Sequence, residues 1–396
     1  MGIARAQVLT TVDCDVVVVG GGPAGLIAAR DLAARGHHAI VLEEHDRIGA
    51  PVHCTGVLGL EAFDELQLPR HTILGVAQSA RFVSADGSSV VVDAERVRAA
   101  VVDRIAFDTV LAGEAVDAGA AIYTGEGVRG IESRGDGVEV RTSCRTVRAR
   151  AAVIACGASY RFNRALGLGL PRLLVHSAQL EAPFPEIDHV EVHLGRRVAP
   201  GGFGWVVPFR RGGDAFARIG LMCDGRAAAR FQHFAARIRH RHGIAGVWPT
   251  ARMKVLPLAP VQRTWARRVL AVGDAAGLVK PTTGGGIYYG LLTGRIAADV
   301  LSSALAADRF DAARLRTYEQ RWRDRLGPEI KAGLAFRAVV SRLSDGAIDA
   351  LVELARVDGI LPLLRQTADF NWHRTAALSL LRHASFRRVV VSSMWS

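Results

Sequence analysis

Residues 15–45 read DVVVVGGGPAGLIAARDLAARGHHAIVLEEH, and this stretch decides the fold of the chain. Its four consecutive valines predict a parallel strand that is buried on both faces. A glycine-rich turn follows, then a helix of small residues, then a second apolar run that ends at Glu43. This order of strand, glycine turn, helix and strand is typical of the βαβ unit that binds a dinucleotide.

The glycines of this turn fit the GxGxxG pattern at Gly20, Gly22 and Gly25. The first permits the tight turn, the second lets the backbone approach a pyrophosphate, and the third allows the helix to pack closely on the strand. The pyrophosphate would lie at the positive N-terminus of the helix, where Ala24 is also a predicted contact. Glu43, 18 residues beyond Gly25, would accept hydrogen bonds from ribose hydroxyls, which favours FAD or NAD over NADP.

A second glycine-rich motif, about 250 residues further along the chain, decides between FAD and NAD. A predicted strand ends in VGDAAG at 272–277, and PTTGGG follows at 281–286. The carboxylate would bind a ribityl chain, and backbone N–H groups of the loop would face the flavin near N1 and O2, where negative charge grows on reduction. An NAD site needs neither, so the sequence predicts FAD. The residues predicted to bind it here are Gly273, Asp274, Gly284, Gly285, Gly286 and Ile287.

The chain resembles the geranylgeranyl reductase family of FAD-dependent oxidoreductases, whose fold is similar to that of para-hydroxybenzoate hydroxylase. The distinguishing segments are PVHCTGV at 51–57, GWVVPF at 204–209 and KPTTGGGIYYG at 280–290. Relatives more often carry a second aromatic residue in the middle segment, as in YxWxFP. This departure leaves the path of an alkyl chain and the identity of the substrate open.

The resemblance also implies roles for single residues. It places Arg104 in contact with FAD, Cys54 beside the flavin ring and the substrate, and Trp205 on the wall of the substrate cavity. Tyr288, which follows the flavin loop, is a further candidate for substrate contact, with helix packing as an equally good explanation. No metal site is expected.

Cys54 lies in a loop bounded by glycines at 49 and 56, directly after the predicted ribose-binding strand. A hydride delivered from flavin N5 to an alkene must be matched by one proton, and a thiol can donate it. The thiol could instead only position the substrate, and a small buried residue with an incidental thiol is the plainer alternative.

The fold class predicted from these patterns is α/β, with a GxGxxG-type FAD-binding domain, an antiparallel-sheet substrate domain and a helical C-terminal region. The FAD-binding domain is discontinuous, and within it the pattern predicts a helix over 101–118. The expected segments are 1–75, 96–158 and 266–310 for the FAD-binding domain, 76–95 and 159–265 for the substrate-binding sheet, and 311–396 for the helices.

Composition narrows the class of protein. The 396 residues carry a net charge of +12, but the arginines are scattered, which favours a solvated basic surface and no nucleic-acid partner. The five cysteines show no paired spacing typical of disulfides or metal ligands. No apolar stretch is long enough to span a bilayer, and the first residues lack a secretory signal. We expect a cytoplasmic protein, and peripheral contact with the inner face of the membrane through its basic C-terminal helices stays open.

We therefore expect an enzyme: an FAD-dependent reductase that saturates C=C bonds of a geranylgeranyl or polyprenyl chain on a lipid, quinone or pigment tail. The sequence has one dinucleotide fingerprint, so the electron donor would be transient NAD(P)H or a reduced carrier protein. A flavin-dependent monooxygenase or halogenase on the same fold is the first alternative, because fold alone does not fix function. A non-catalytic lipid- or quinone-binding flavoprotein is the second. The prenyl substrate, the number of bonds reduced and the oligomeric state stay open.

Overall fold

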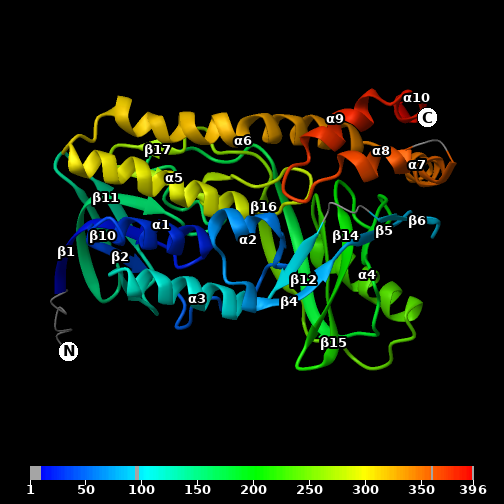
Figure 1. Ribbon diagram of the computed structural model, residues 1–396, viewed down its shortest axis with the longest axis horizontal. Helices are drawn as coiled ribbons and strands as arrows, with labels where there is room; N and C mark the ends of the chain where they lie inside the picture. Colours follow the sequence, from blue (N-terminus) through cyan, green and yellow to red (C-terminus); the bar gives the residue numbers. More distant parts are fainter. Residues whose placement is uncertain (1–9, 94–97, 358–359, 395–396) are drawn as a thin grey trace, which may run out of the picture.

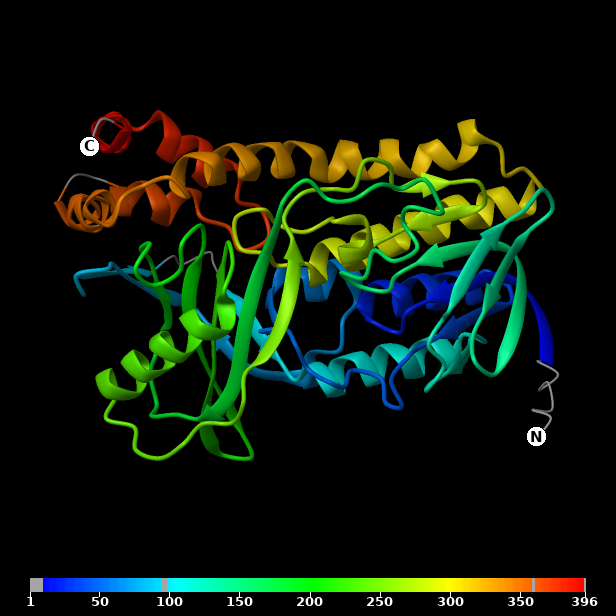
Figure 2. The same ribbon diagram turned by 180° about the vertical axis from the view of Figure 1, so that it is seen from behind.

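The computed structural model describes residues 10–93, 98–357 and 360–394. Outside this description lie the first nine residues, the last two, and the predicted domain boundary between residues 95 and 96. Two sheets lie side by side, and a layer of long helices runs along both of them (Figures 1 and 2). The predicted α/β class, with two sheets and a helical C-terminal region, is confirmed. The division into domains by residue number stays a prediction.

The first sheet has eight strands and contains the βαβ unit predicted from the N-terminal motif. Strand β1 (Thr10–Val19) runs parallel to β2 (Ala39–Leu42) on one side and to β11 (Arg145–Ile154) on the other. The valines at 16–19 are buried, as expected for a strand covered on both faces. The remaining strands are β8 (Ala121–Tyr123), β9 (Gly130–Ser133), β10 (Val138–Arg141), β17 (Trp265–Ala266) and β18 (Val269–Ala271).

Helices of small residues pack tightly beside this sheet. Helix α1 (Pro23–Ala33) contacts both α3 (Arg104–Asp117) and α5 (Ile287–Ala306). The crossing of α1 and α5 depends on Gly294, where an added Cβ would overlap the carbonyl oxygen of Ala24. Helix α6 (Ala312–Val340) then lies along α5 (Figure 1).

The predicted helix over 101–118 is wrong at its start. Val101 and Val102 belong to β7 (Ala99–Val102), which pairs with β3 (Val57–Gly59) and β4 (Ile73–Ala77) in a small three-stranded sheet. These β-branched residues are fully buried there, which suits a strand better than a helix. Asp103 then caps α3 by accepting hydrogen bonds from the backbone N–H groups of Ile105 and Ala106.

The second sheet has seven strands in the order β16-β12-β15-β14-β13-β5-β6. Its neighbours are antiparallel, as predicted, except that β13 runs parallel to β5. Helix α4 (Ala227–Arg241) packs against β12 and β15. The strands are β5 (Ser79–Val83), β6 (Ser89–Asp93), β12 (Leu174–Pro183), β13 (Val190–His193), β14 (Phe203–Arg211), β15 (Asp214–Cys223) and β16 (Arg252–Pro257).

The C-terminal region is helical and folds back over the second sheet. Its helices are α7 (Asp345–Val357), α8 (Ile360–Thr367), α9 (Arg374–Arg382) and α10 (Ala384–Met394). Helices α7 and α8 contact the edge strand β6, and α9 returns to α6 (Figure 2). Within the described residues, no helix combines the length and the apolar character needed to cross a bilayer.

Replacement of Trp322 by Ala is expected to destabilise the fold by about 3–5 kcal/mol, because the cavity left behind a large buried side chain is not refilled. The side chain of Trp322 is 1% exposed, and its indole N–H donates to Thr264 Oγ1 at 2.9 Å. The free energy of unfolding can be measured by denaturant titration. Val247→Ala serves as the control, since Val247 is 95% exposed, and equal losses in the two variants would contradict the packing described here.

Candidate active site

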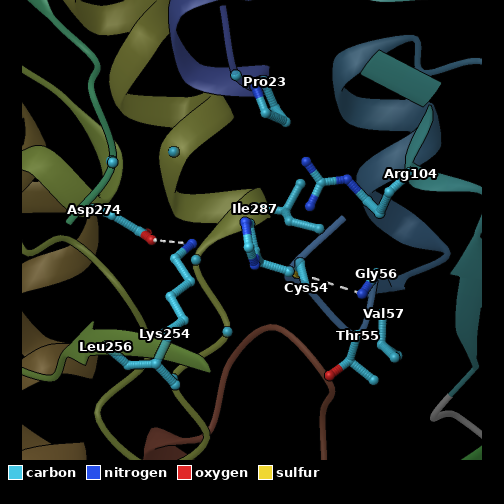
Figure 3. Close-up of a pocket in the computed structure, with 18 of the residues that line it drawn as sticks. Pro23, Cys54, Thr55, Gly56, Val57, Arg104, Lys254, Leu256, Asp274 and Ile287 are labelled. Atoms are coloured by element: carbon cyan, nitrogen blue, oxygen red, sulfur yellow. Dashed lines mark hydrogen bonds and ion pairs between the residues drawn. The ribbon is translucent and has the colours of Figure 1, made fainter. Parts of the chain in front are cut away.

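A cavity of about 590 Å³ lies between the two sheets. The carboxyl ends of β1, β2, β11 and β18 open onto it, which is where ligands bind in open α/β sheets. Strands β12, β13, β14 and β16 of the second sheet form its opposite wall. The cavity thus brings together residues from most of the length of the chain (Figure 3).

The first glycine motif forms one end of the cavity. An added Cβ at Gly25 would overlap the carbonyl oxygen of Gly20, so the helix approaches the turn as closely as the sequence predicts. An added Cβ at Gly22 would meet no described atom within 4 Å, because Gly22 borders the open cavity. Gly20 and Ala24 also line the cavity, whereas Gly25 does not and has a packing role.

Glu43 is held at the end of β2 with its carboxylate against the glycine turn. Its Oε2 accepts from the backbone N–H of Gly21 at 2.7 Å, and its Oε1 accepts from the backbone N–H of His45 at 3.0 Å. The side chain lines the cavity. These hydrogen bonds fix the carboxylate at the edge of the cavity, and its role as a ribose ligand stays a prediction.

The second glycine motif meets the first at the cavity, where a Cβ added to Gly273 would lie 3.2 Å from Ala24 Cβ. Asp274 follows β18, and its backbone carbonyl accepts a hydrogen bond from the Tyr160 hydroxyl at 2.8 Å. Its carboxylate pairs with Lys254 of β16, with 3.3 Å between Oδ2 and Nζ (Figure 3). All the residues predicted from this motif line the cavity, namely Gly273, Asp274, Gly284, Gly285, Gly286 and Ile287.

The Cys54 loop lines the same cavity, and Figure 3 shows Cys54 apart from the pair formed by Asp274 and Lys254. The Sγ atom of Cys54 accepts from the backbone N–H of Gly56 at 3.3 Å, and the side chain borders the cavity. Arg104 lies beside it and makes a bidentate contact with Asp108, the shortest distance being 2.7 Å from Nη2 to Oδ2. Burial disfavours the charge of Arg104, but the carboxylate of Asp108 outweighs this effect and raises the pKa of the guanidinium, which therefore stays charged.

Arg218, which the sequence analysis missed, ties the second sheet to the Cys54 loop. It is 1% exposed, and its Nη1 donates to the backbone carbonyls of Thr55 at 2.7 Å and Val102 at 3.0 Å. Its Nε donates to Glu181 Oε2 at 3.0 Å. The available signal was a single arginine inside the otherwise apolar strand AFARIGLM at 215–222, since a charge in such a strand must be satisfied by the fold.

Trp205 lines the cavity, and the role in substrate contact that the family resemblance implies for it stays a prediction. Its indole N–H donates to Gln179 Oε1 at 3.2 Å, and the same oxygen accepts from the Thr55 hydroxyl at 2.7 Å. The ring lies over Gly220, where an added Cβ would overlap it. Phe203 packs edge-on against the ring with 5.7 Å between centroids. The contacts with Gln179, Gly220 and Phe203 therefore fix the orientation of the Trp205 ring.

Tyr288 does not line the cavity, in contrast to the sequence expectation. It is 2% exposed, and its hydroxyl donates to Glu65. Its ring packs edge-on against Trp372 with 5.6 Å between centroids. The position of Tyr288 on α5 directs it into the helical layer rather than towards the cavity, so helix packing is the better explanation and we do not retain it as a substrate contact.

The strand, glycine turn and helix, the second glycine motif and the cavity that joins them define an FAD-dependent oxidoreductase with a GxGxxG-type nucleotide-binding domain. Comparisons with known proteins agree with this class. Residues 15–339 match the family model described as "Lycopene cyclase protein". Digeranylgeranylglycerophospholipid reductase 2 of Methanothermobacter thermautotrophicus is 32% identical over 363 residues, which cover 85% of this chain and 90% of that protein.

Two solved structures share the fold. A geranylgeranyl bacteriochlorophyll reductase-like protein from Thermoplasma acidophilum superposes with a TM-score of 0.84 at 24% identity, covering 96% of this chain and 98% of that one. A flavin-dependent brominase gives a TM-score of 0.67 at 15% identity, with 96% and 99% covered. The chain belongs to the geranylgeranyl reductase family of FAD-dependent oxidoreductases. The predicted family, enzyme class and cofactor are thereby confirmed.

Replacement of Gly56 by Ala is expected to displace the Cys54 loop. Gly56 has a φ of +66°, and a Cβ there would lie 2.7 Å from Arg218 Nη1 and 3.0 Å from the Val102 carbonyl oxygen. Gly36→Ala is the matched control, because Gly36 has a φ of +82° with open space around it. The control should lose only about 1–2 kcal/mol from backbone strain.

The readouts are the free energy of unfolding and the rate at which iodoacetamide alkylates Cys54, followed by mass spectrometry. The exposed thiol of Cys144 provides an internal reference in each sample. We expect Gly56→Ala to lose more stability than the control and to change the alkylation rate of Cys54 relative to Cys144. Identical behaviour of the two variants would show that Gly56 and Arg218 do not constrain this loop.

Proposed function

We propose that the protein is an FAD-dependent reductase that saturates isolated C=C bonds in a polyprenyl chain. The observation that carries this proposal is a single cavity with two kinds of wall. One wall consists of the two glycine motifs and their carboxylates, and the other is the apolar face of the second sheet beside Cys54. Such a cavity suits a reaction between a bound flavin and a long hydrocarbon.

The residues present fit FAD. The open space at Gly22 leaves room for a pyrophosphate at the N-terminus of α1, where the helix dipole favours negative charge. Glu43 and Asp274 would bind ribose and ribityl hydroxyls, and Gly285, Gly286 and Ile287 would offer backbone N–H groups to the flavin ring. The N–H of Gly284 already donates to the carbonyl of Lys280 at 2.8 Å, so Gly284 would contribute the turn that shapes this loop. Arg104 would bind from the side of the Cys54 loop. When bound in its reduced form, FAD supplies the hydride for the reaction.

A C=C bond becomes saturated by adding one hydride and one proton, and we infer that a side chain of the protein delivers this proton. Cys54 is the candidate donor, since its thiol borders the cavity and carries a proton that solvent can replace. Trp205 and Phe203 would hold the alkyl chain alongside. The hydrogen bonds from Arg218 to Thr55 and Val102 would keep the thiol in place during the transfer.

The name of the relative in Methanothermobacter thermautotrophicus supports a lipid-linked geranylgeranyl chain as the substrate class. It also argues against a non-catalytic role. For electron supply we retain transient NAD(P)H or a reduced carrier protein. Because such a lipid resides in a bilayer, we propose peripheral contact through the basic C-terminal helices, with the protein itself in the cytoplasm. The basic residues concerned in the described part of that region include Arg365, Arg374, Arg382, Arg387 and Arg388.

The test of the reaction is anaerobic incubation of the purified, dithionite-reduced protein with polyprenyl lipids, followed by mass spectrometry. We expect a gain of two mass units for each reduced bond. Parallel incubations use a geranylgeranyl glycerolipid, a prenylated quinone and geranylgeranyl diphosphate, so the result also identifies the substrate class. A product that forms only in air and carries oxygen or halogen would replace the proposal by the monooxygenase or halogenase alternative.

In the same assay, Cys54→Ala is expected to lower the rate at which the double bond is reduced by about 10²–10⁴-fold, the usual range for loss of a positioned proton donor. Cys54→Ser separates the two roles left open for this residue, because the hydroxyl keeps the size but is a much weaker acid. Loss in both variants supports proton donation. Full activity in Cys54→Ala would exclude it, and loss in Ala with full activity in Ser would leave positioning as the role of Cys54.

Replacement of Gly22 by Ala is expected to abolish FAD binding without destabilising the fold. Gly22 has a φ of −81°, which alanine adopts readily, and an added Cβ would meet no described atom within 4 Å. The methyl group would instead occupy the space proposed for the pyrophosphate. FAD affinity can be measured by flavin fluorescence on addition to apoprotein, and stability by thermal unfolding of the same samples.

The matched control for Gly22→Ala is Gly113→Ala, at an exposed position of α3 that is equally free of neighbours. It should bind FAD as the unmodified protein does. Unchanged FAD affinity in Gly22→Ala would mean that the protein binds FAD with its pyrophosphate elsewhere.

A further inference from the structure

A buried lysine on the flavin loop is used neither by the proposed reaction nor by any ion pair. Lys280 is 4% exposed and lines the cavity at the base of the second glycine motif. Among the residues that the structure describes, no carboxylate oxygen lies within the 4.0 Å that defines an ion pair with its Nζ. A buried ammonium without a counter-charge is costly, so its retention calls for an explanation.

The fold holds this ammonium by neutral groups only. Its Nζ donates to the backbone carbonyl of Phe370 at 2.8 Å and lies 4.1 Å from the centroid of the Phe370 ring. The imidazole of His373 is also close, but burial and then the charge of Lys280 lower its pKa to about 3, so it is neutral. The carboxylates of Glu61 and Asp369 are the acidic groups that act on Lys280, both from beyond ion-pair distance.

The ammonium of Lys280 lies against the side of Gly285 on which a Cβ would point. A Cβ added to Gly285 would lie 2.7 Å from Lys280 Cε and 3.4 Å from its Nζ. The two residues are also joined through the backbone, since the N–H of Lys280 donates to the carbonyl of Gly285 at 3.1 Å. Gly285 belongs to the loop whose N–H groups are proposed to face N1 and O2 of the flavin.

The second lysine of the cavity differs in this respect. The charge of Lys254 is compensated by the carboxylate of Asp274 at 3.3 Å. Lys280 is thus the cavity lysine without an ion-pair partner among the described residues, and its Cε and Nζ lie against the loop at Gly285. Burial lowers its pKa to about 8, so most of the amine remains protonated at neutral pH.

We propose that Lys280 is a redox-tuning residue, whose buried ammonium stabilises the negative charge that FAD gains on two-electron reduction. The missing counter-charge is then supplied by the cofactor itself, and only in its reduced state. Oxidised FAD with two electrons and one proton gives the anionic reduced form, so a fixed positive charge next to the loop that would face N1 and O2 would favour reduction. This inference rests on the proposed orientation of FAD in the cavity.

The test compares the flavin midpoint potential of the FAD-loaded protein with that of two variants, by anaerobic equilibration with reference dyes. Lys280→Gln removes the charge but keeps a donor for the Phe370 carbonyl, and Lys280→Arg keeps both. We expect the Gln variant to lose at least tenfold in its preference for reduced over oxidised FAD, which corresponds to a potential about 30 mV more negative. The Arg variant should shift less. Lys331→Met, at an exposed site on α6, should not shift at all.

An unchanged potential in Lys280→Gln would overturn the inference, as would equal shifts in the Gln and Arg variants, which would indicate displacement of the loop. A raised KM for the polyprenyl substrate with no change in potential would assign Lys280 to a substrate headgroup instead. The potentials are independent of turnover, because they are measured on bound flavin alone. Failure of the unmodified protein to bind FAD would contradict the proposed cofactor site rather than the role of Lys280.

Discussion

The close contact between Gly25 and the carbonyl of Gly20 is the constraint on which the rest of the structure depends. It leaves no room for a side chain, so the N-terminus of α1 comes as near to the end of β1 as a backbone allows. The helix dipole is thereby directed at the cavity from one side. Gly294 imposes the same closeness between α1 and α5. Helix α5, and the flavin loop that precedes it, can therefore reach the same cavity from residues far away in the sequence.

Two charged side chains of the second sheet form hydrogen bonds or ion pairs with residues outside that sheet. Arg218 belongs to the second sheet but donates to carbonyls at the Cys54 loop and β7, and Lys254 of the same sheet pairs with Asp274 beside the first. A buried charge is tolerated only when its partners are fixed, so these contacts restrict how the sheets can move relative to one another. The cavity between them consequently has a defined shape, which the proposed reaction between a bound flavin and a hydrocarbon chain would require.

Local patterns in the sequence predicted the parts of the site that local chemistry determines. The glycine turn, Glu43, Asp274 and the flavin loop all follow from short motifs whose backbone demands are strict. The Cys54 loop came from a family resemblance, because a single thiol has no distinctive spacing. Arg218, Lys254 and the contacts of Phe370 could not be derived in this way, since each depends on the pairing of strands or loops distant in sequence. Tyr288 shows the converse error, as proximity along the chain does not fix the direction of a side chain on a helix.

The similarity of the fold to a flavin-dependent brominase shows that this architecture alone does not choose the reaction. The choice must come from what surrounds the flavin. Here the second sheet contributes apolar side chains opposite the glycine motifs, with Trp205 fixed by Gln179 and Gly220, and the polar groups near them include the Cys54 thiol, the Thr55 hydroxyl and the Lys254 ammonium. Lys280 of the flavin loop donates its hydrogen bond to the backbone carbonyl of Phe370. An apolar wall beside one exchangeable thiol proton supports the proposed saturation of an alkene, because a hydride and a proton are all that this reaction would consume.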